Sequence, residues 1–278
     1  MELLFTSIKD AIRLKLYLTA NGLRETLVKS QDQFMYTFQV DQRKRSRYEQ
    51  ALITFIKDVK RNEWLNNTLQ HKFHYENEDE RSHIIEIATQ MFSGARHDLS
   101  ELAGVIDESG LIKEAVSDLL SFGGAVSFES FSRFRLKPYY ERVEKYLEIA
   151  IDEYKMEQEY QTFVQMLRDY LRNRATRMEV IHLLLNQTPK FYDEHLHELS
   201  SDEIKEMMDQ RLLANHPIYV DSAVIAPLLS IAAIKVYVYT DKADQPLIRT
   251  LSNIFEERIS VLTPVHFSIL KKAYVNKP

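Results

Sequence analysis

A long stretch of helical pattern, free of glycine and proline from Tyr139 to Arg177, constrains the fold of this chain more than any other feature. One apolar stripe recurs through it at the three- and four-residue spacing of an α-helix. Its members are Val143, Leu147, Ala150, Tyr154, Phe163, Leu167 and Leu171. Because the pattern exceeds the length of a typical globular helix, it predicts either one long helix or two helices with an unmarked break. We therefore expect a predominantly helical α+β fold.

The N-terminal residues 1–41 predict a small β-α-β-β unit. A short apolar run from Glu2 to Thr6 precedes Ser7, whose hydroxyl is typical of a helix N-cap. The predicted helix ends at Asn21 and Gly22. Two segments of alternating apolar and polar residues then flank the polar turn at Ser30, Gln31 and Asp32, which indicates a β-hairpin.

Helical periodicity dominates the next part of the chain, residues 42–177. Two amphipathic faces precede the long stretch, one made of Tyr48, Ala51, Leu52, Phe55, Ile56 and Val59, the other of Ile84, Ile85, Ile87, Ala88 and Met91. Glycines at positions 104, 110, 123 and 124 mark breaks between helices. This part is therefore predicted to be a central helical region.

The C-terminal residues 178–278 predict a second α/β unit, which either stands alone or packs as one domain with residues 1–41. It begins with a β-hairpin, Val180–Leu185 and 190–192, and Ser200 or Ser201 then caps a helix through Leu213. The remaining pattern is a helix (222–232), a strand (234–240), a helix (246–256), a strand (258–263) and the tail Pro264 to Pro278. A helix between two strands indicates a β-α-β crossover with parallel strands.

Composition removes several functional classes. The chain of 278 residues has 36 Lys+Arg against 41 Asp+Glu, a formal net charge of −5, so we do not expect nucleic acid or an anionic membrane as a partner. It has no cysteine, which excludes disulfides, thiolate zinc sites, iron–sulfur ligation and cysteine nucleophiles.

Hydropathy patterning predicts a cytoplasmic location. The first 16 residues mix charged with apolar side chains and lack the features of a signal peptide. The most apolar stretch, Ala223 to Tyr239, is interrupted by Pro227 and Lys235 and divides into a helix followed by a strand. We therefore expect no membrane span.

The common nucleotide-binding, zincin and hydrolase motifs are absent from the chain. The segment Asp193 to Glu198 has metal-ligand residue types, including His195 and His197. However, side chains two residues apart share a side only on a strand, and no third ligand can be identified. We predict no metal and no cofactor, and we expect a non-enzymatic protein rather than an enzyme.

Two clusters of basic residues leave local phosphate binding as an alternative. The run Arg43 to Arg47 is interpreted as a solvated helix start. The set Arg168, Arg172, Arg174 and Arg177 lies near the end of the long helical pattern, where cations favour the helix dipole.

The predicted parallel strands supply a position for a ligand. Open parallel sheets bind ligands at the carboxyl ends of their strands. Thr240, Asp241 and Asp244 follow the strand 234–240, so they are candidate binding residues for a metal ion or a phosphate group, with an ordinary connecting loop as the alternative.

A family resemblance adds a second set of candidates. The segment Phe131 to Tyr139, followed by 150–154 and 157–160, resembles the YtxC-like family, which is associated with sporulation in endospore-forming bacteria. The segments 221–238 and 251–261 resemble the closing unit of that family. Relatives often carry cysteines beyond the last strand, and this chain has none there. Within the shared segment, Arg133, Arg135 and Tyr139 are candidate binding residues, with the arginines suited either to an anion or to an ion pair with Glu141 or Glu144.

These observations lead to one hypothesis with two alternatives. The resemblance and the missing catalytic motifs favour a sporulation protein that acts through contacts with an unknown protein partner. The alternatives are a small-ligand or nucleotide-binding protein or enzyme that uses the strand ends near Asp241, and nucleic-acid binding through the arginine clusters.

Overall fold

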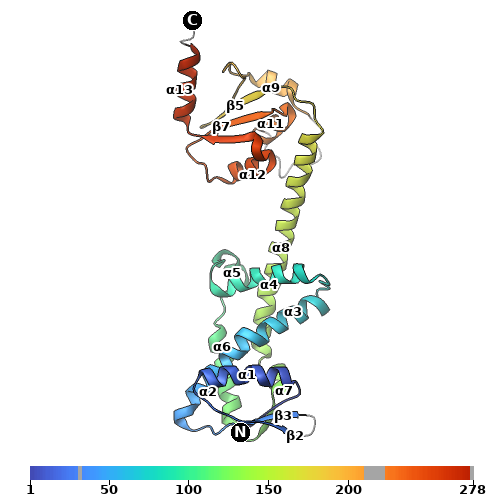
Figure 1. Cartoon of the computed structure of the whole chain (residues 1–278), viewed down its shortest axis with the longest axis vertical. Helices are drawn as coiled ribbons and strands as arrows, with labels where there is room; N and C mark the ends of the chain where they lie inside the picture. Colours follow the sequence, from blue (N-terminus) through green and yellow to red (C-terminus); the bar gives the residue numbers. More distant parts are fainter. Residues whose placement is uncertain (31–32, 210–222, 276–278) are drawn as a thin grey trace. The chain divides into compact units, whose positions relative to one another are not determined.

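The computed structural model describes residues 1–30, 33–209 and 223–275, and the chain divides into two compact units, Met1–Glu157 and Gln158–Pro278 (Figure 1). Helices dominate both units and each contains one small mixed sheet, which confirms the predominantly helical α+β fold. The division predicted from the sequence, with boundaries at 41 and 177, stays a prediction. No helix among the described residues has the length and apolar character needed to span a bilayer.

The sheet of the first unit has the strand order β2-β3-β1-β4. Its strands are β1 (Glu2–Phe5), β2 (Leu27–Ser30), β3 (Gln33–Thr37) and β4 (Ala125–Ser127). Antiparallel pairing of β3 with both β1 and β2 confirms the predicted β-α-β-β unit. The turn residues Gln31 and Asp32 lie outside the described residues. The sequence does not predict β4, which returns from the helical region and pairs in parallel with β1.

Seven helices and a π-helical turn among the described residues of the first unit precede the long helix. They are α1 (Ile8–Ala20), α2 (Gln42–Phe55), η1 (Ile56–Lys60), α3 (Arg61–His71), α4 (Glu78–Ser93), α5 (His97–Ala103), α6 (Glu108–Ser121) and α7 (Phe128–Phe134). Side-chain oxygens of Ser7, Asp41 and Asn77 accept hydrogen bonds from the free N–H groups at the starts of α1, α2 and α4. Ser7 is the N-cap that the sequence predicts.

The pattern between Tyr139 and Arg177 forms one helix, α8 (Lys137–Arg172), of 36 residues. The alternative of two helices is therefore wrong. The apolar stripe is buried in two separate places: Val143, Leu147, Ala150 and Tyr154 belong to the core of the first unit, and Phe163, Leu167 and Leu171 belong to the core of the second.

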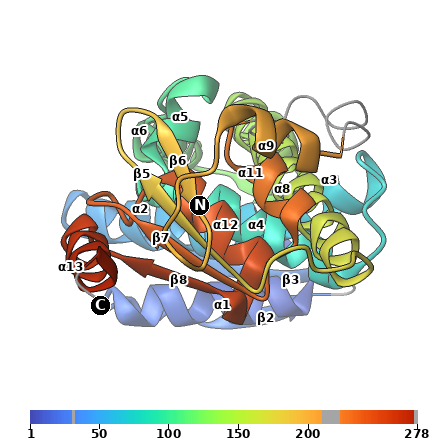
Figure 2. The ribbon, with the colours of Figure 1, turned by 90° about the horizontal axis from the view of Figure 1, so that it is seen from above.

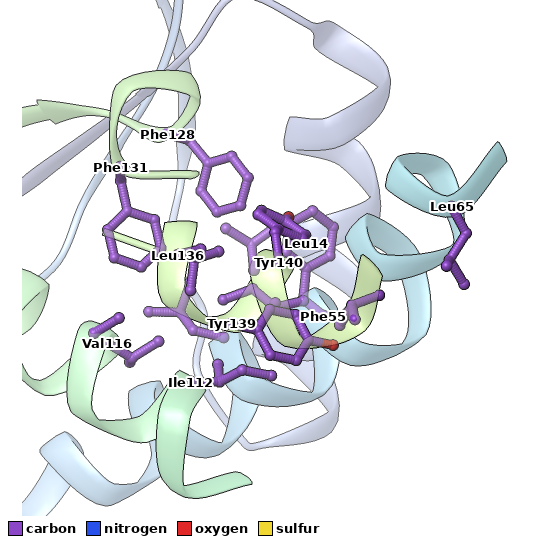
Figure 3. Close-up of a cluster of buried hydrophobic side chains, with 14 of the residues drawn as sticks. Leu14, Phe55, Leu65, Ile112, Val116, Phe128, Phe131, Leu136, Tyr139 and Tyr140 are labelled. Atoms are coloured by element: carbon purple, nitrogen blue, oxygen red, sulfur yellow. The ribbon is translucent and has the colours of Figure 1, made fainter. Parts of the chain in front are cut away.

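Aromatic and aliphatic side chains from both ends of the first unit share one core. Figure 3 shows Phe128, Phe131 and Tyr139 packed together with side chains of α1, α2 and α6. Phe5 stacks on Phe128 with ring centroids 5.0 Å apart, so this contact joins the N-terminal sheet to α7. Burial of these large rings supplies much of the driving force for folding.

The sheet of the second unit has the strand order β6-β5-β7-β8. Its strands are β5 (Val180–Leu185), β6 (Pro189–Tyr192), β7 (Lys235–Tyr239) and β8 (Ile259–Leu262). β5 and β6 form the predicted antiparallel hairpin, and β5, β7 and β8 pair in parallel. Helix α12 (Pro246–Phe255) connects β7 to β8, with a single 3-10 turn, η2 (Glu256–Arg258), before β8, which confirms the predicted β-α-β crossover.

The two faces of this sheet are covered by different helices. Alternate residues such as Val236 and Val238 pack with α11 (Ile225–Ile231), α12 and the end of α8. The opposite face carries Tyr192 and Tyr239, which pack against Phe267 of α13 (Pro264–Val275). In Figure 2, β5, β7 and β8 run side by side and α13 stands apart from α11 and α12. The sequence does not predict α13.

The capping signal after the hairpin is also confirmed. α9 (Ser201–Met207) begins after Ser200, whose hydroxyl accepts from the N–H of Glu203, while the Glu203 carboxylate accepts from the N–H of Ser200. The predicted continuation of this helix to Leu213 is wrong, because α9 ends at Met207 and the backbone of Met208 is extended. Residues 210–213 of that prediction lie outside the described residues.

Candidate functional site

The first unit contains a pocket of about 730 Å³ that brings together α1, η1, α3, α7 and the start of α8. Arg133, one of the residues singled out from the sequence, lines it. The volume falls in the range of ligand sites, about 300–1,000 Å³. We name it the Arg133 pocket; its other lining residues are Asp10, Lys60, Trp64, Phe128, Glu129, Ser132, Lys137, Tyr140, Glu141 and Glu144.

Local structure explains how α7 presents its polar side chains to the pocket. Ser127 caps α7, its hydroxyl accepting a hydrogen bond of 3.2 Å from the N–H of Ser130. Phe128 and Phe131 are buried and anchor the helix to the core, whereas Arg133 is exposed. The same short helix therefore holds an apolar anchor and a cationic group that faces the pocket.

An aromatic pair forms the apolar wall of the Arg133 pocket. The rings of Trp64 and Tyr140 are stacked, with centroids 5.1 Å apart and planes inclined by 11°. The hydroxyl of Tyr140 lies 3.2 Å from that of Ser132, and burial raises the pKa of Tyr140. The wall is therefore a flat, uncharged surface with hydroxyl groups at its border.

Two acidic side chains that line the pocket, Asp10 and Glu129, make ion pairs or hydrogen bonds with other residues of the first unit. Asp10 pairs with Lys60 at 2.8 Å. Glu129 accepts hydrogen bonds of 2.8 and 2.7 Å from the N–H and hydroxyl of Thr6, and one of 2.8 Å from Ser127. Burial alone would raise the pKa of Glu129, but these hydrogen bonds lower it below its ordinary value. Both carboxylates thus already have partners within the first unit.

The two glutamates of α8 also have partners, and these are lysines. Glu141 lies 3.8 Å from Lys137, and Glu144 pairs with Lys72. Among the described residues, neither Arg133 nor Arg135 pairs with Glu141 or Glu144. The expectation of such an ion pair from the sequence is therefore wrong.

Arg133 has a different environment from the other charged residues that line the pocket. Within the part of the chain that the structure describes, its guanidinium forms no ion pair or hydrogen bond. An arginine fork is suited to bidentate contact with a carboxylate or phosphate. The pocket therefore combines an aromatic wall with a positive charge that is available to an anionic group.

Tyr139 lies behind the pocket and not in it. Its side chain is 1% exposed, and its hydroxyl donates a hydrogen bond of 2.7 Å to the buried carboxylate of Glu108. Arg61 donates to both oxygens of that carboxylate at 2.9 Å. Burial, and then the negative charge of Glu108, raises the pKa of Tyr139. In the structure Tyr139 holds α8 to the core.

Arg135 lies beside a smaller hollow of about 240 Å³, which Phe122, Phe131 and Phe134 also line. Phe122 is 62% exposed and Phe134 is 68% exposed. Aromatic residues are enriched in protein interfaces relative to the rest of the surface. The structure thus places Arg133 and Arg135 at different hollows of the first unit.

The candidates after β7 lie in the second unit, at the carboxyl end of the strand as expected. Thr240 is buried, its N–H donates to the carbonyl of Leu262 at 2.9 Å, and its hydroxyl accepts from the N–H of Lys242 at 3.1 Å. Asp241 and Asp244 are exposed in the loop that leads to α12. These contacts show that the Thr240 hydroxyl shapes the turn; a ligand role for Asp241 and Asp244 stays a prediction.

The basic clusters make contacts within the chain. Arg45 donates hydrogen bonds to Ser117 and Ser121 of α6. In the second unit Arg168 bonds the carbonyl of Asn253, and Arg174 pairs with Asp209 at 2.8 Å. These arginines therefore support the fold.

The segment with metal-ligand residue types is part of a turn. His195 lies 3.4 Å from Glu194, and His197 lies 3.3 Å from Asp193. Among the described residues, no group of three or more histidine, aspartate and glutamate side chains converges in a way that would hold a metal ion.

Sequence reasoning missed most of the Arg133 pocket. Asp10, Lys60 and Trp64 are far from Arg133 in the chain, and only folding brings them together. Trp64 is the only tryptophan in the chain, and this rarity was the one signal that could have drawn attention to it.

The fold and the pocket define a predominantly helical α+β protein with a pocket that places the guanidinium of Arg133 beside an aromatic wall. Comparison with known proteins gives its family. The model of the YtxC-like family matches residues 47–260. The chain is also 32% identical over 218 residues to "Uncharacterized protein YtxC" of Bacillus subtilis (strain 168), covering 78% of this chain and 76% of that protein. The chain belongs to the YtxC-like family. No solved structure matches it significantly.

Proposed function

We propose that this protein acts through protein contacts, and that the Arg133 pocket receives an acidic side chain or a terminal carboxylate of its partner. The observation that carries the proposal is the guanidinium of Arg133, which has no partner among the described residues although every carboxylate lining the same pocket has one. The stacked pair of Trp64 and Tyr140 offers an apolar surface beside that charge.

The surroundings of the pocket support a macromolecular partner. Phe134 follows Arg133 in α7, and its exposed ring, with that of Phe122, provides further apolar contact area. Interfaces are enriched in aromatic residues and arginine, and a few such residues supply most of the binding energy. A partner bound at Arg133 would thus be close to two exposed phenylalanines.

Two matched variants test this proposal. The experiment uses the tagged full chain to capture proteins from sporulating cells of a spore-forming bacterium. It is repeated with the variants Arg133→Glu and Arg135→Glu. We expect a protein that is recovered with the wild type and with Arg135→Glu but lost with Arg133→Glu, because only Arg133 lines the pocket. Equal recovery with both arginine variants would contradict the proposal.

A direct binding measurement accompanies the capture experiment. Trp64 is the only tryptophan of the chain and lines the pocket, so its fluorescence reports occupancy. A short acidic peptide should change the emission in a saturable way, and its glutamine-substituted, amidated counterpart should not. If both peptides gave the same response, charge recognition at Arg133 would be ruled out.

We further propose that the protein works in the cytoplasm during sporulation, which rests on the family resemblance. Deletion of the gene in its host should lower the frequency of heat-resistant spores, and a fluorescent fusion should be distributed through the cytoplasm. Normal spore yield together with constant expression during growth would contradict this role.

A further inference from the structure

The second unit has a pocket of its own, about 630 Å³ in volume, between the sheet and α13. Its residues all lie between positions 180 and 274, so it is independent of the Arg133 pocket. The volume lies within the range of small-molecule sites, about 300–1,000 Å³. We name it the His182 pocket after a buried residue on its floor.

Three aromatic rings from neighbouring strands form this floor. His182 of β5 is the register partner of Tyr237 of β7, and their ring centroids are 5.2 Å apart with planes inclined by 16°. The ring of Tyr239 lies 5.9 Å from His182 at the same inclination. Residues two apart on a strand share one face, so the three rings form one stacked aromatic group on the α13 side of the sheet.

The polar groups of the floor are uncharged near neutral pH. Nδ1 of His182 lies 2.9 Å from the hydroxyl of Tyr239. Burial lowers the pKa of His182 and raises that of Tyr239 to about 12, so the pair stays neutral. The floor can therefore form hydrogen bonds without carrying a charge.

The charge of the remaining lining residues argues against an anionic ligand. Among the described residues, no lysine or arginine lines the His182 pocket, and the carboxylate there, Glu194, carries negative charge. A phosphate or carboxylate buried in it would lack the cationic partner that such groups require. The ligand is therefore not a phosphorylated nucleotide.

The polar groups also argue against a purely aliphatic ligand. Nδ1 of His266 already bonds the hydroxyl of Thr263 at 2.8 Å. A hydrocarbon chain would cover the other ring nitrogen of His266 and the hydroxyl of Tyr237 without offering them hydrogen bonds, which is unfavourable for buried polar groups. A flat heterocycle satisfies both requirements, because its faces stack on aromatic rings and its heteroatoms form hydrogen bonds.

We propose that the His182 pocket binds an uncharged, planar heteroaromatic molecule of about nucleoside size, with its ring against Tyr237 and its heteroatoms toward His182 and His266. Apolar side chains of α13 complete the enclosure. Ile269 lines the pocket and is nevertheless 62% exposed, as expected for a wall that a ligand covers.

Riboflavin is a suitable probe, because flavin fluorescence is quenched when the ring stacks on tyrosine. Titration with the full chain should give saturable quenching. Flavin mononucleotide, which differs by one phosphate, should bind with an affinity that is lower by roughly tenfold or more. Adenosine should compete with riboflavin, and adenosine monophosphate should compete poorly.

Two substitutions on α13 provide the matched comparison. Ile269→Glu places a carboxylate in the pocket and should weaken riboflavin binding by roughly tenfold or more. Val265→Glu makes the same change at a residue of the same helix that is 65% exposed and does not line the pocket, and it should bind like the wild type. Both positions are exposed, so folding should be preserved.

Several results would overturn the proposal. These are the absence of saturable binding for both riboflavin and adenosine, equal affinity for the phosphorylated probes, and equal loss of binding in the two α13 variants. Arg133→Glu should leave riboflavin binding unchanged, since it lies in the other unit. Failure of this proposal is thus distinguishable from failure of partner binding at the Arg133 pocket.

Discussion

Tyr139 donates a hydrogen bond of 2.7 Å to Oε1 of Glu108, and both side chains are buried in the core of the first unit. The carboxylate also accepts two hydrogen bonds of 2.9 Å from Arg61, whose guanidinium carbon lies 4.4 Å above the ring of Phe92. This buried network joins α3, α6 and α8 directly behind the Arg133 pocket. The stability of the network therefore affects the position of the pocket walls.

Removal of the Tyr139 hydroxyl should destabilise the protein. In Tyr139→Phe the ring still fills its place in the core, but the Glu108 carboxylate no longer accepts a hydrogen bond from the Tyr139 hydroxyl. A hydrogen bond to a charged group contributes about 1.5–3 kcal/mol. We expect the free energy of unfolding, measured by urea denaturation, to fall by about this amount.

Tyr140→Phe is the matched control for this change. It removes a hydroxyl from the neighbouring residue, where the partner is the uncharged hydroxyl of Ser132 at 3.2 Å. A neutral hydrogen bond contributes only about 0.5–1.5 kcal/mol. A larger loss for Tyr140→Phe than for Tyr139→Phe would show that the Glu108 network does not dominate.

Breaking the ion pair should have a still larger effect. Arg61→Met leaves the Glu108 carboxylate buried with Tyr139 and, at 3.7 Å, Lys57 as its remaining partners. Removal of one member of a buried pair costs about 3–5 kcal/mol when the other charge is left without a partner, and the remaining contact with Lys57 places the expected loss toward the lower end of this range.

A double-mutant cycle checks the mechanism of this loss. Replacing both charges, in Arg61→Met with Glu108→Leu, removes the uncompensated charge as well as the pair. The double variant should be more stable than the sum of the single losses predicts, with a coupling of about 0.5–3 kcal/mol. Additive losses would mean that the two side chains act independently.

Local signals were sufficient to predict most elements of the fold. The caps at Ser7 and Ser200, the hairpin at β5 and β6, and the crossover from β7 to β8 all follow from hydrogen-bonding chemistry and periodicity over a few residues. β4 was missed because three residues carry too little periodic signal. Its partner β1 also lies at the other end of the first unit in the sequence, so no local pattern indicates the pairing. The helix α13 was missed because the residues after the last predicted strand were interpreted as a tail.

The candidate sites were harder to predict, because they are made of residues that only folding brings together. Arg133 was found through a family resemblance, but its aromatic neighbours Trp64 and Tyr140 come from two other helices. The pair of Glu144 with Lys72 joins residues 72 positions apart and has no local signal, whereas Lys137 and Glu141 have the i,i+4 spacing of a helical ion pair that could have been recognised. The environment of His182 could not be predicted for the same reason, since its hydrogen-bond partner Tyr239 lies 57 positions further along the chain.

The capping box of α9 should make a measurable contribution to stability. Ser200 bonds the N–H of Glu203, and the carboxylate of Glu203 bonds the N–H and hydroxyl of Ser200. Loss of such a cap costs about 0.5–2 kcal/mol, so Ser200→Ala should lower the free energy of unfolding by this amount. Ser200→Asp, which keeps a side-chain acceptor, should retain most of the stability; an equal loss in both variants would contradict the capping role.

The pH dependence of stability should reveal the buried histidine of the second unit. Burial lowers the pKa of His182 below its ordinary value of 6.5, so between the two values the unfolded chain binds a proton that the folded chain does not. Its contribution to stability is therefore complete above pH 6.5 and is lost as the pH falls toward the folded-state pKa. We expect the free energy of unfolding of the wild type to fall more steeply between about pH 7.5 and 5 than that of His182→Gln. The slope and not the absolute stability is compared, since the substitution also removes the hydrogen bond to Tyr239 while the other histidines are common to both proteins. Identical slopes would show that His182 titrates alike in the folded and unfolded chains.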